Sequence, residues 1–238
     1  GLVQISNAVG KLYNSISDKG TFALQSSDVI LGGNNSQFTG TFDISEMSSL
    51  TASLAEHLGS AAIQNSGTLK LDTDSNWSLE NSVTGSGDFV KSGSGNVTLG
   101  TGAQWTGTTE INAGGLILGS VDKAVMLTSE LVNIQKSGSL SGYGGVEGNV
   151  NNKGAIFVGS ERSLEKNTAS PTTFTIGGNV INSGDIWIGN GVGPAGNHMV
   201  INGNYVGDNG HIYLDSILNN DDSLTDKLII NGNTSGST

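Results

Sequence analysis

Few residues of this chain have the types and spacing that chemistry requires. Residues 191–196 match the G-x-G-x-x-G spacing of dinucleotide-binding loops, but such a loop must open a helix that faces the pyrophosphate. Residues 197–202 read instead as a strand. The histidines His57, His198 and His211 show no metal-ligand spacing, and we expect each to be a solvated residue at a coil edge. No serine stands in the strained G-x-S-x-G turn of an activated nucleophile.

Acidic residues could support two further chemistries. Asp215, Asp221, Asp222 and Asp226 lie close in sequence and could bind calcium, but they match neither the EF-hand nor the glycine-rich repeat spacing. A hydrated acidic loop is the alternative that we favour. Carbohydrate cleavage needs paired carboxylates, or a base beside metal-binding aspartates, whereas Arg162 is the sole arginine and lies in a polar segment. The sequence therefore predicts that the chain is not an enzyme and uses no cofactor or metal.

Composition excludes several other classes of protein. There is no cysteine, so disulfide scaffolds, zinc ribbons and thiol nucleophiles are excluded. The net charge of −11, with only 10 basic residues, is unsuited to nucleic acid, which requires a Lys/Arg patch. No run of 18 apolar residues is present, which predicts no membrane span. We expect the chain to be a piece of a longer protein.

Internal repeats predict the architecture. Residues 29–44 resemble residues 97–111, and both copies continue to a similar phrase, at 63–69 and 134–140. Later, a Gly-Asn pair precedes a short apolar strand at Gly148-Asn149, Gly178-Asn179 and Gly203-Asn204, and a fourth pair follows at Gly232-Asn233. Units of roughly 20–30 residues are too short to bury a core alone, so they must stack.

Apolar residues recur at every second position inside these units, which places each pair on one face of a sheet. The pairs are Leu69 and Leu71, Leu116 and Leu118, Ile156 and Val158, Ile186 and Ile188, and Ile212 and Leu214. Sandwich strands recur every 8–12 residues and propeller blades are longer. The sequence therefore predicts an all-β fold, a single-stranded right-handed parallel β-helix. Residues 45–62 leave one alternative open, a short helix that uses Met47, Leu50, Leu54 and Leu58.

One stretch has the order of a known repeat. It reads Gly85-Ser-Gly-Asp-Phe-Val-Lys-Ser-Gly-Ser-Gly-Asn-Val-Thr-Leu-Gly100 and continues through Trp105-Thr-Gly to Ile111-Asn-Ala-Gly-Gly-Leu116. This order resembles the passenger-associated transport repeat of autotransporters, and residues 29–71 look like a divergent copy. The end of the chain is similar to the pertactin-like C-terminal passenger region, the autochaperone. The residues that carry this second likeness are Gly142, Tyr143, Gly144, Gly148, Asn149, Gly203, Asn204, Tyr205, Asp226 and Lys227.

The resemblance implies a division of the chain and a location. Residues 1–141 would be passenger coils with transport-type repeats, and residues 142–238 the autochaperone-like coils. The family's passengers are exported through the periplasm and outer membrane to the cell surface. The complete protein would carry its own C-terminal outer-membrane β-barrel, and the C-terminal coils would fold first.

Three aromatic residues form a further candidate surface. Phe157, Trp187 and Tyr213 each stand between the two inward residues of a repeat, so coils in register would stack their rings on the exterior. An exposed apolar patch can mark an interaction surface. A ladder that braces the rod is the alternative that we favour.

Two functions are compatible with these observations. In the first, the chain belongs to an adhesin or a self-associating biofilm and virulence factor, whose partner is a host surface ligand or an identical passenger on a neighbouring cell. In the second, it is a purely structural stem and autochaperone, and the activity lies in an N-terminal passenger region.

Overall fold

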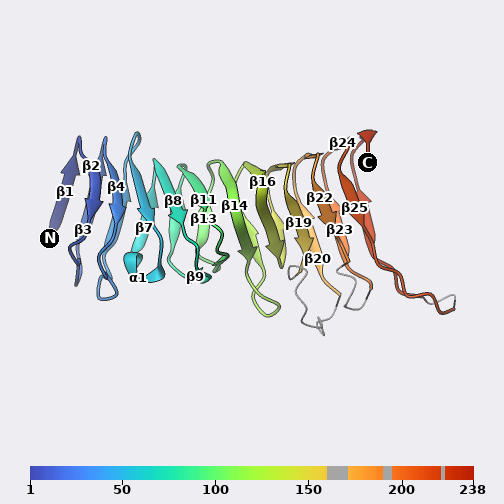
Figure 1. The fold of residues 1–238 in the computed structure, drawn as a ribbon, viewed down its shortest axis with the longest axis horizontal. Coiled ribbons are helices and arrows are strands. Elements are labelled where there is room, and N and C mark those ends of the chain that lie inside the picture. The colour runs from blue at the N-terminus through green and yellow to red at the C-terminus, as the bar shows by residue number, and fades with distance from the viewer. Residues whose placement is uncertain (160–170, 190–194, 221–222) are drawn as a thin grey trace.

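The chain forms a straight rod of stacked coils, with the N-terminus at one end and the C-terminus at the other (Figure 1). The structure is a computed structural model, and it describes residues 1–159, 171–189, 195–220 and 223–238. Within this part of the chain no helix is long and apolar enough to cross a membrane.

Three parallel sheets run along the rod. The six-stranded sheet comprises β1 (Leu2–Ser6), β3 (Thr21–Gln25), β5 (Thr41–Ile44), β7 (Ala62–Asn65), β10 (Val83–Gly85) and β13 (Ala103–Trp105). The five-stranded sheet comprises β15 (Val125–Leu127), β17 (Gly144–Val146), β20 (Thr173–Ile176), β23 (His198–Ile201) and β26 (Lys227–Ile230).

The 16-stranded sheet extends along the whole rod and bends around one corner. Its main path runs through β2 (Val9–Leu12), β4 (Asp28–Leu31), β6 (Ser49–Ala52), β8 (Thr68–Asp72), β11 (Asp88–Ser92), β14 (Thr109–Leu118), β16 (Leu131–Gly142), β18 (Asn149–Asn152), β21 (Val180–Asn182), β24 (Tyr205–Asp208) and β27 (Thr234–Ser237). Its side branch consists of β9 (Trp77–Leu79), β12 (Val97–Leu99), β19 (Ala155–Val158), β22 (Asp185–Trp187) and β25 (His211–Tyr213).

Successive coils wind in the same direction, because every ladder between these strands is parallel. Ile156 pairs with Ile186, and Ile186 pairs with Ile212, so the period-two residues of three repeats lie in register. This register confirms the predicted parallel β-helix and excludes antiparallel hairpins as the basis of the fold.

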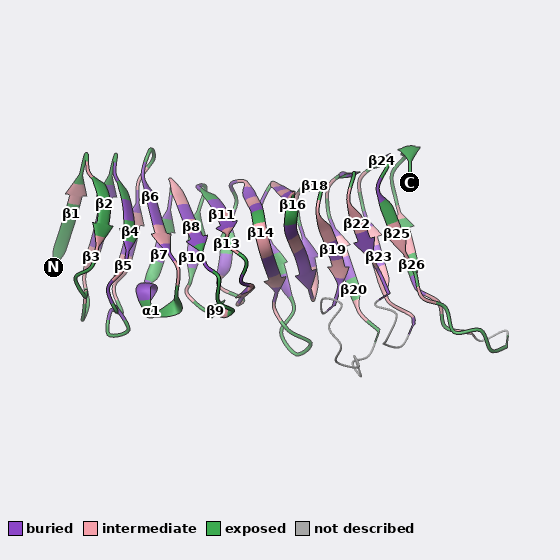
Figure 2. Cartoon of the chain, in the orientation of Figure 1, coloured by how far each residue is buried: buried purple, intermediate pink, exposed green. Residues whose placement is uncertain are grey.

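The core is one continuous column of inward-facing side chains. The strands β8, β19 and β23 alternate between buried and less buried residues, and buried segments (purple in Figure 2) recur along the rod. This alternation places the aliphatic residues inside, as the period of two requires. The prediction of an inward side chain is wrong for Leu214, which is 50% exposed. The reason is that β25 ends at Tyr213 and the chain leaves the sheet there.

The segment 45–62 contains only one turn of helix. The strands β6 and β7 lie at its two ends, and α1 (Ala55–Leu58) lies between them. Met47, which the helical spacing placed on an apolar face, is 84% exposed. The residues on either side of α1 pair with neighbouring coils as β6 and β7. The short helix that the spacing left open is therefore limited to α1, and of its four apolar residues only Leu58 lies in it.

The helical turn buries a histidine that we expected to be solvated. His57 is 9% exposed, and its Nδ1 accepts the N–H of Ser53 at 3.2 Å. Burial lowers the pKa of the His57 imidazole, so the neutral ring that can accept this bond is favoured. The prediction of a solvated residue is therefore wrong for His57.

Candidate folding and interaction surfaces

The Gly-Asn pairs of the late repeats form a column of hydrogen bonds along the rod. The Oδ1 atom of Asn149 accepts the backbone N–H of Asn179 at 2.8 Å. Asn179 accepts in the same way from Asn204 at 2.8 Å, and Asn204 accepts from Asn233 at 2.9 Å. Each coil is therefore tied to the next by a side chain that completes a turn. We call these four residues the asparagine column.

The glycine before each asparagine is required by this column. A Cβ atom on Gly178 would lie 2.6 Å from Oδ1 of Asn149, and one on Gly203 would lie 2.6 Å from Oδ1 of Asn179. Those distances are shorter than van der Waals contact, so a side chain would displace the asparagine of the preceding coil. The Gly-Asn repeat in the sequence therefore has a steric cause.

A second, buried column of polar groups runs inside the corner of the rod. Nδ2 of Asn152 donates to Oδ1 of Asn182 at 2.8 Å, and Nδ2 of Asn182 donates to the hydroxyl of Tyr205 at 3.2 Å. The Tyr205 hydroxyl lies 2.9 Å from Oγ1 of Thr238. Asn152 and Asn182 are at most 1% exposed, and buried polar groups are costly unless they are paired in this way.

Asp226 holds together the segments that enter the last coil. Its Oδ1 accepts the backbone N–H groups of Gly196 and Asn197, each at 2.8 Å. Its Oδ2 accepts the N–H of Asp215 at 2.8 Å, and only 4% of the residue is exposed. Lys227 follows as the exposed first residue of β26 and pairs with His198 in the sheet. Asp226 thus fixes the position from which the last coil begins.

The Gly-Tyr-Gly motif forms the corner between β16 and β17. Gly142 and Gly144 have φ values of 120° and 115°, a region that favours glycine. The N–H of Tyr143 donates to Leu118 at 2.7 Å, and its carbonyl accepts the N–H of Val125 at 2.8 Å. The predicted motif residues thus act through backbone geometry here, whereas Asn149, Asn204, Tyr205 and Asp226 act through side chains.

Phe157, Trp187 and Tyr213 are stacked, and we call these three rings the aromatic ladder. The ring centroids of Phe157 and Trp187 are 6.3 Å apart at an interplanar angle of 12°. Those of Trp187 and Tyr213 are 3.6 Å apart at 6°. All three side chains are half-buried. Whether the ladder braces the rod or binds a partner stays a prediction.

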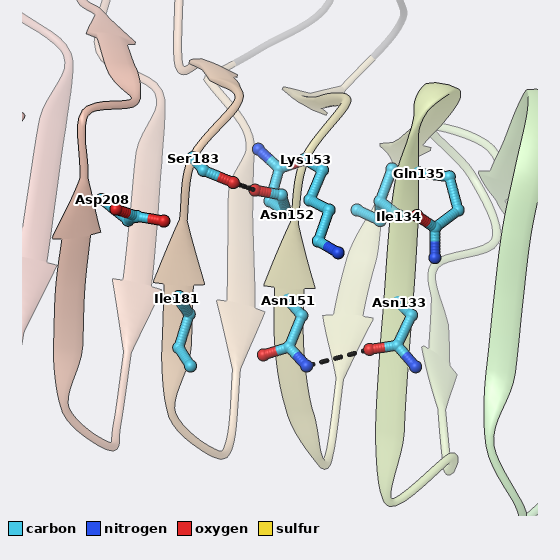
Figure 3. Close-up of a pocket in the computed structure, with 9 residues that line it drawn as sticks. All are labelled: Asn133, Ile134, Gln135, Asn151, Asn152, Lys153, Ile181, Ser183 and Asp208. Carbon is cyan, nitrogen blue, oxygen red and sulfur yellow. Dashed lines mark hydrogen bonds between the residues drawn. The ribbon is translucent and has the colours of Figure 1, made fainter.

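An outward row of amides lies on the face of β14, β16 and β18. Asn151 donates to Oδ1 of Asn133 at 2.9 Å (Figure 3), and Asn133 donates to Glu110. On the next coil Ile181, 46% exposed, stands where an amide would continue the row. A pocket of about 350 Å³ opens there. It is lined by Asn133, Ile134, Gln135, Asn151, Asn152, Lys153, Ile181, Ser183 and Asp208. We call this surface the amide face.

The sequence did not single out the most unusual charged group. Lys91 is fully buried, and its ammonium donates to the carbonyls of Ser92 at 2.7 Å, Gly93 at 2.9 Å and Ala113 at 3.1 Å. Burial lowers the pKa of Lys91, and Asp72 and Asp74 oppose that shift. Its position two residues after Phe89, on the same face of β11, is the signal that could have revealed this burial.

The remaining candidates from the sequence are the acidic cluster, the glycine-rich match and two histidines. Among the described residues no group of three or more acidic or histidine side chains could hold a metal ion. Asp221, Asp222, Arg162 and residues 191–194 lie outside the described residues. The strand expected after the glycine-rich match is confirmed as β23. His211 is exposed and lies 3.2 Å from Asp185.

The fold is a parallel β-helix whose late coils are joined by glycine-asparagine turns. The sequence model of the autochaperone domain type 1 family matches residues 180–238. The chain is therefore a segment of an autotransporter passenger that includes an autochaperone region, and it belongs to the proteins that are exported to the cell surface or beyond. The predicted division at residues 141 and 142 stays a prediction.

Three relatives from Escherichia coli (strain K12) are similar to the chain. It is 41% identical to the uncharacterized protein YuaQ over 188 residues, which cover 79% of this chain and 11% of YuaQ. It is 40% identical to the uncharacterized lipoprotein YdeK, over 63% of this chain and 12% of YdeK. It is 36% identical to the probable autotransporter YfaL, over 56% of this chain and 10% of YfaL. The chain thus spans about a tenth of the length of these relatives. No solved structure matches it.

Proposed function

We propose that this segment is the stem of a passenger whose C-terminal coils nucleate the folding of the coils before them, and that it acts without catalysis. The observation that supports this role is that both polar columns continue to the last coil. The asparagine column ends at Asn233 and the buried column ends at Thr238. An ordered last coil thus presents a preformed template to the coil before it. In the complete protein the passenger's partner would be its own outer-membrane barrel.

Refolding kinetics test this role. We expect the double variant Asn179→Ala and Asn204→Ala to lose about 2 kcal/mol of folding free energy, since two hydrogen bonds of about 1 kcal/mol each are removed. If the C-terminal coils form the nucleus, this loss appears as refolding that is more than about tenfold slower, with an almost unchanged unfolding rate. Stopped-flow fluorescence after dilution from guanidinium measures both rates.

A matched control is available in the same coils. Asn231 donates to the side chain of Asn202 at 2.9 Å on the exposed surface, and this bond joins two side chains. The double variant Asn202→Ala and Asn231→Ala should change the stability by less than about 0.5 kcal/mol. An unchanged refolding rate in the Asn179 and Asn204 variant, with faster unfolding alone, would contradict nucleation by these coils.

We also propose an adhesive or self-associating role for the amide face, with a host surface ligand or an identical passenger as the partner. The observation in its favour is that the row of bonded amides stops beside the exposed Ile181, at a pocket rimmed by Lys153, Ser183 and Asp208. An apolar group surrounded by polar groups is the usual arrangement of a binding patch.

Charge placed on this face tests the adhesive role. We expect Ile181→Lys to weaken association of passenger-coated beads, or their binding to host cells, by about tenfold or more, as for a residue at the centre of an interface. Ile30→Lys is the control, because Ile30 is 43% exposed on the distant strand β4. Equal binding by both variants and the wild type would exclude the amide face as the contact surface.

A further inference from the structure

The turn between β24 and β25 contains an Asn-Gly pair, Asn209 and Gly210, near the C-terminal end of the rod (Figure 1). Each residue suits the shape of this turn. Asn209 has a φ of 60°, in the left-handed region that asparagine tolerates better than most residues. A Cβ atom on Gly210 would lie 2.4 Å from Nδ2 of Asn182, so this position excludes a side chain. The turn therefore favours an asparagine followed directly by a glycine.

The backbone nitrogen of Gly210 has no hydrogen-bond acceptor among the described residues, although Gly210 is buried. In the equivalent turn two coils earlier, the N–H of Gly154 donates to Oδ1 of Asn152 at 3.1 Å. In β24 the position of Asn152 is occupied by Gly207, since both pair with Asn182. Gly207 has no side chain that could accept the N–H of Gly210. A buried donor without an acceptor is unfavourable.

The asparagine of this pair also differs from its counterparts in the described chain. The side chain of Asn209 is exposed and makes no hydrogen bond to a described residue. In the two other described Asn-Gly pairs, the N–H of Gly203 donates to the preceding coil at 3.1 Å and that of Gly232 at 3.2 Å. The side chains of Asn202 and Asn231 are bonded to each other at 2.9 Å. Both groups of the pair are thus unrestrained at residues 209–210 and restrained at the other two pairs.

We propose that Asn209 is a site of spontaneous deamidation, with water as the only co-reactant. The nitrogen of Gly210 attacks Cγ of Asn209, the Cγ–Nδ2 bond breaks, and ammonia leaves with the proton of the glycine nitrogen. The absence of a Cβ atom on Gly210 leaves this nitrogen open to the approach. The product is a five-membered succinimide whose nitrogen carries no hydrogen. Cyclisation therefore removes the buried donor that lacked an acceptor.

Water then opens the succinimide in one of two ways. Cleavage of the bond from nitrogen to Cγ gives aspartate, and cleavage of the bond from nitrogen to the backbone carbonyl carbon gives isoaspartate. Either product adds a negative charge beside Asp208, and isoaspartate lengthens the main chain between β24 and β25 by one carbon. Because the N–H of Asn209 bonds to the carbonyl of Ser237 at 3.0 Å, a longer main chain disturbs the contact with the last coil. The proposal goes beyond the folding role and does not rest on it or on the amide face.

Peptide mapping of the folded chain by mass spectrometry tests the proposal. The chain is incubated in a mildly alkaline buffer, which favours loss of the proton from the glycine nitrogen. We expect Asn209 to be converted about tenfold or more faster than Asn202 and Asn231, because hydrogen bonds at those two sites must break before the attack. An isoaspartate-specific methyltransferase assay distinguishes isoaspartate from aspartate.

The same chain unfolded in guanidinium is the matched control, because all three pairs are then unrestrained and should react at similar rates. A second control is Asn209→Gly, which suits the φ of this turn and cannot cyclise there. The melting temperature of the wild type should fall during incubation, and that of folded Asn209→Gly should fall less.

Equal conversion of the three asparagines in the folded chain would overturn the proposal. So would a preference for Asn209 that persists in the unfolded chain, since the local sequence and not the fold would then be its cause. Neither outcome bears on nucleation, which is measured by refolding rates.

Discussion

Replacing Trp105 by alanine is expected to lower the free energy of unfolding by about 4 kcal/mol, the upper part of the range for buried tryptophan. Trp105 has no exposed surface, and its ring stacks on Phe89 with centroids 4.4 Å apart and an interplanar angle of 17°. Its Nε1 donates to the hydroxyl of Thr109 at 2.8 Å. The substitution therefore removes a stacked pair and a hydrogen bond, and it leaves a large cavity between two coils. Guanidinium unfolding followed by circular dichroism measures the loss.

Trp105→Phe separates the two contributions. It keeps an aromatic ring against Phe89 but removes the donor to Thr109, whose hydroxyl still contacts Ser129 at 2.6 Å. We expect a loss of about 1–2 kcal/mol from the smaller ring and the missing bond. If Trp105→Ala cost less than about 1 kcal/mol, the stacked pair would not lie in a packed core and the arrangement of these coils would be wrong.

Replacing Lys91 by methionine is the second large change, with an expected loss of about 3 kcal/mol. Methionine fills a similar volume, so the cost comes from three backbone carbonyls that lose their donor inside the rod. Those carbonyls belong to the last residue of β11, to the turn after it and to β14, so the ammonium joins two coils. The matched control is Lys70→Met on the neighbouring coil. The Lys70 side chain is half-buried on the outer face, and we expect a change of less than about 0.5 kcal/mol.

The stability difference between the wild type and Lys91→Met should also depend on pH. Because burial lowers the pKa of Lys91 in the folded chain, the unfolded chain binds more protons between the lowered pKa and the ordinary one. The stability of the wild type relative to Lys91→Met should therefore rise with pH through that window and be constant below it. A methionine variant as stable as the wild type would mean that burying the charge costs as much as its hydrogen bonds contribute.

Most of the fold could be predicted from the sequence. The period-two residues of successive repeats are in register, and the Gly-Asn pairs form one column of turns. These features could be predicted because a stacked coil repeats its local chemistry, so a position in one repeat predicts its neighbour in space. Predictions from local patterns were wrong where the chain leaves the repeat, at Leu214 and at His57.

The candidate surfaces were harder to predict, because they depend on which side chains share a face after the rod has turned a corner. The sequence singled out the aromatic ladder, since its rings recur at one place in the repeat. It could not show the pocket of the amide face, because residues from several coils line that pocket.

The sequence by itself determined that the chain is a stacked β-helix, because spacing and turn chemistry are local properties that repeat. Only the tertiary structure decided that Lys91, Asn152 and Asn182 are inside. Polar residues at inward positions are tolerated only if partners complete their hydrogen bonds. These partners include Ala113 on the neighbouring coil, 22 residues from Lys91, and Asn182, 30 residues from Asn152. Such pairings depend on the register between neighbouring coils, and a local sequence pattern does not contain that information.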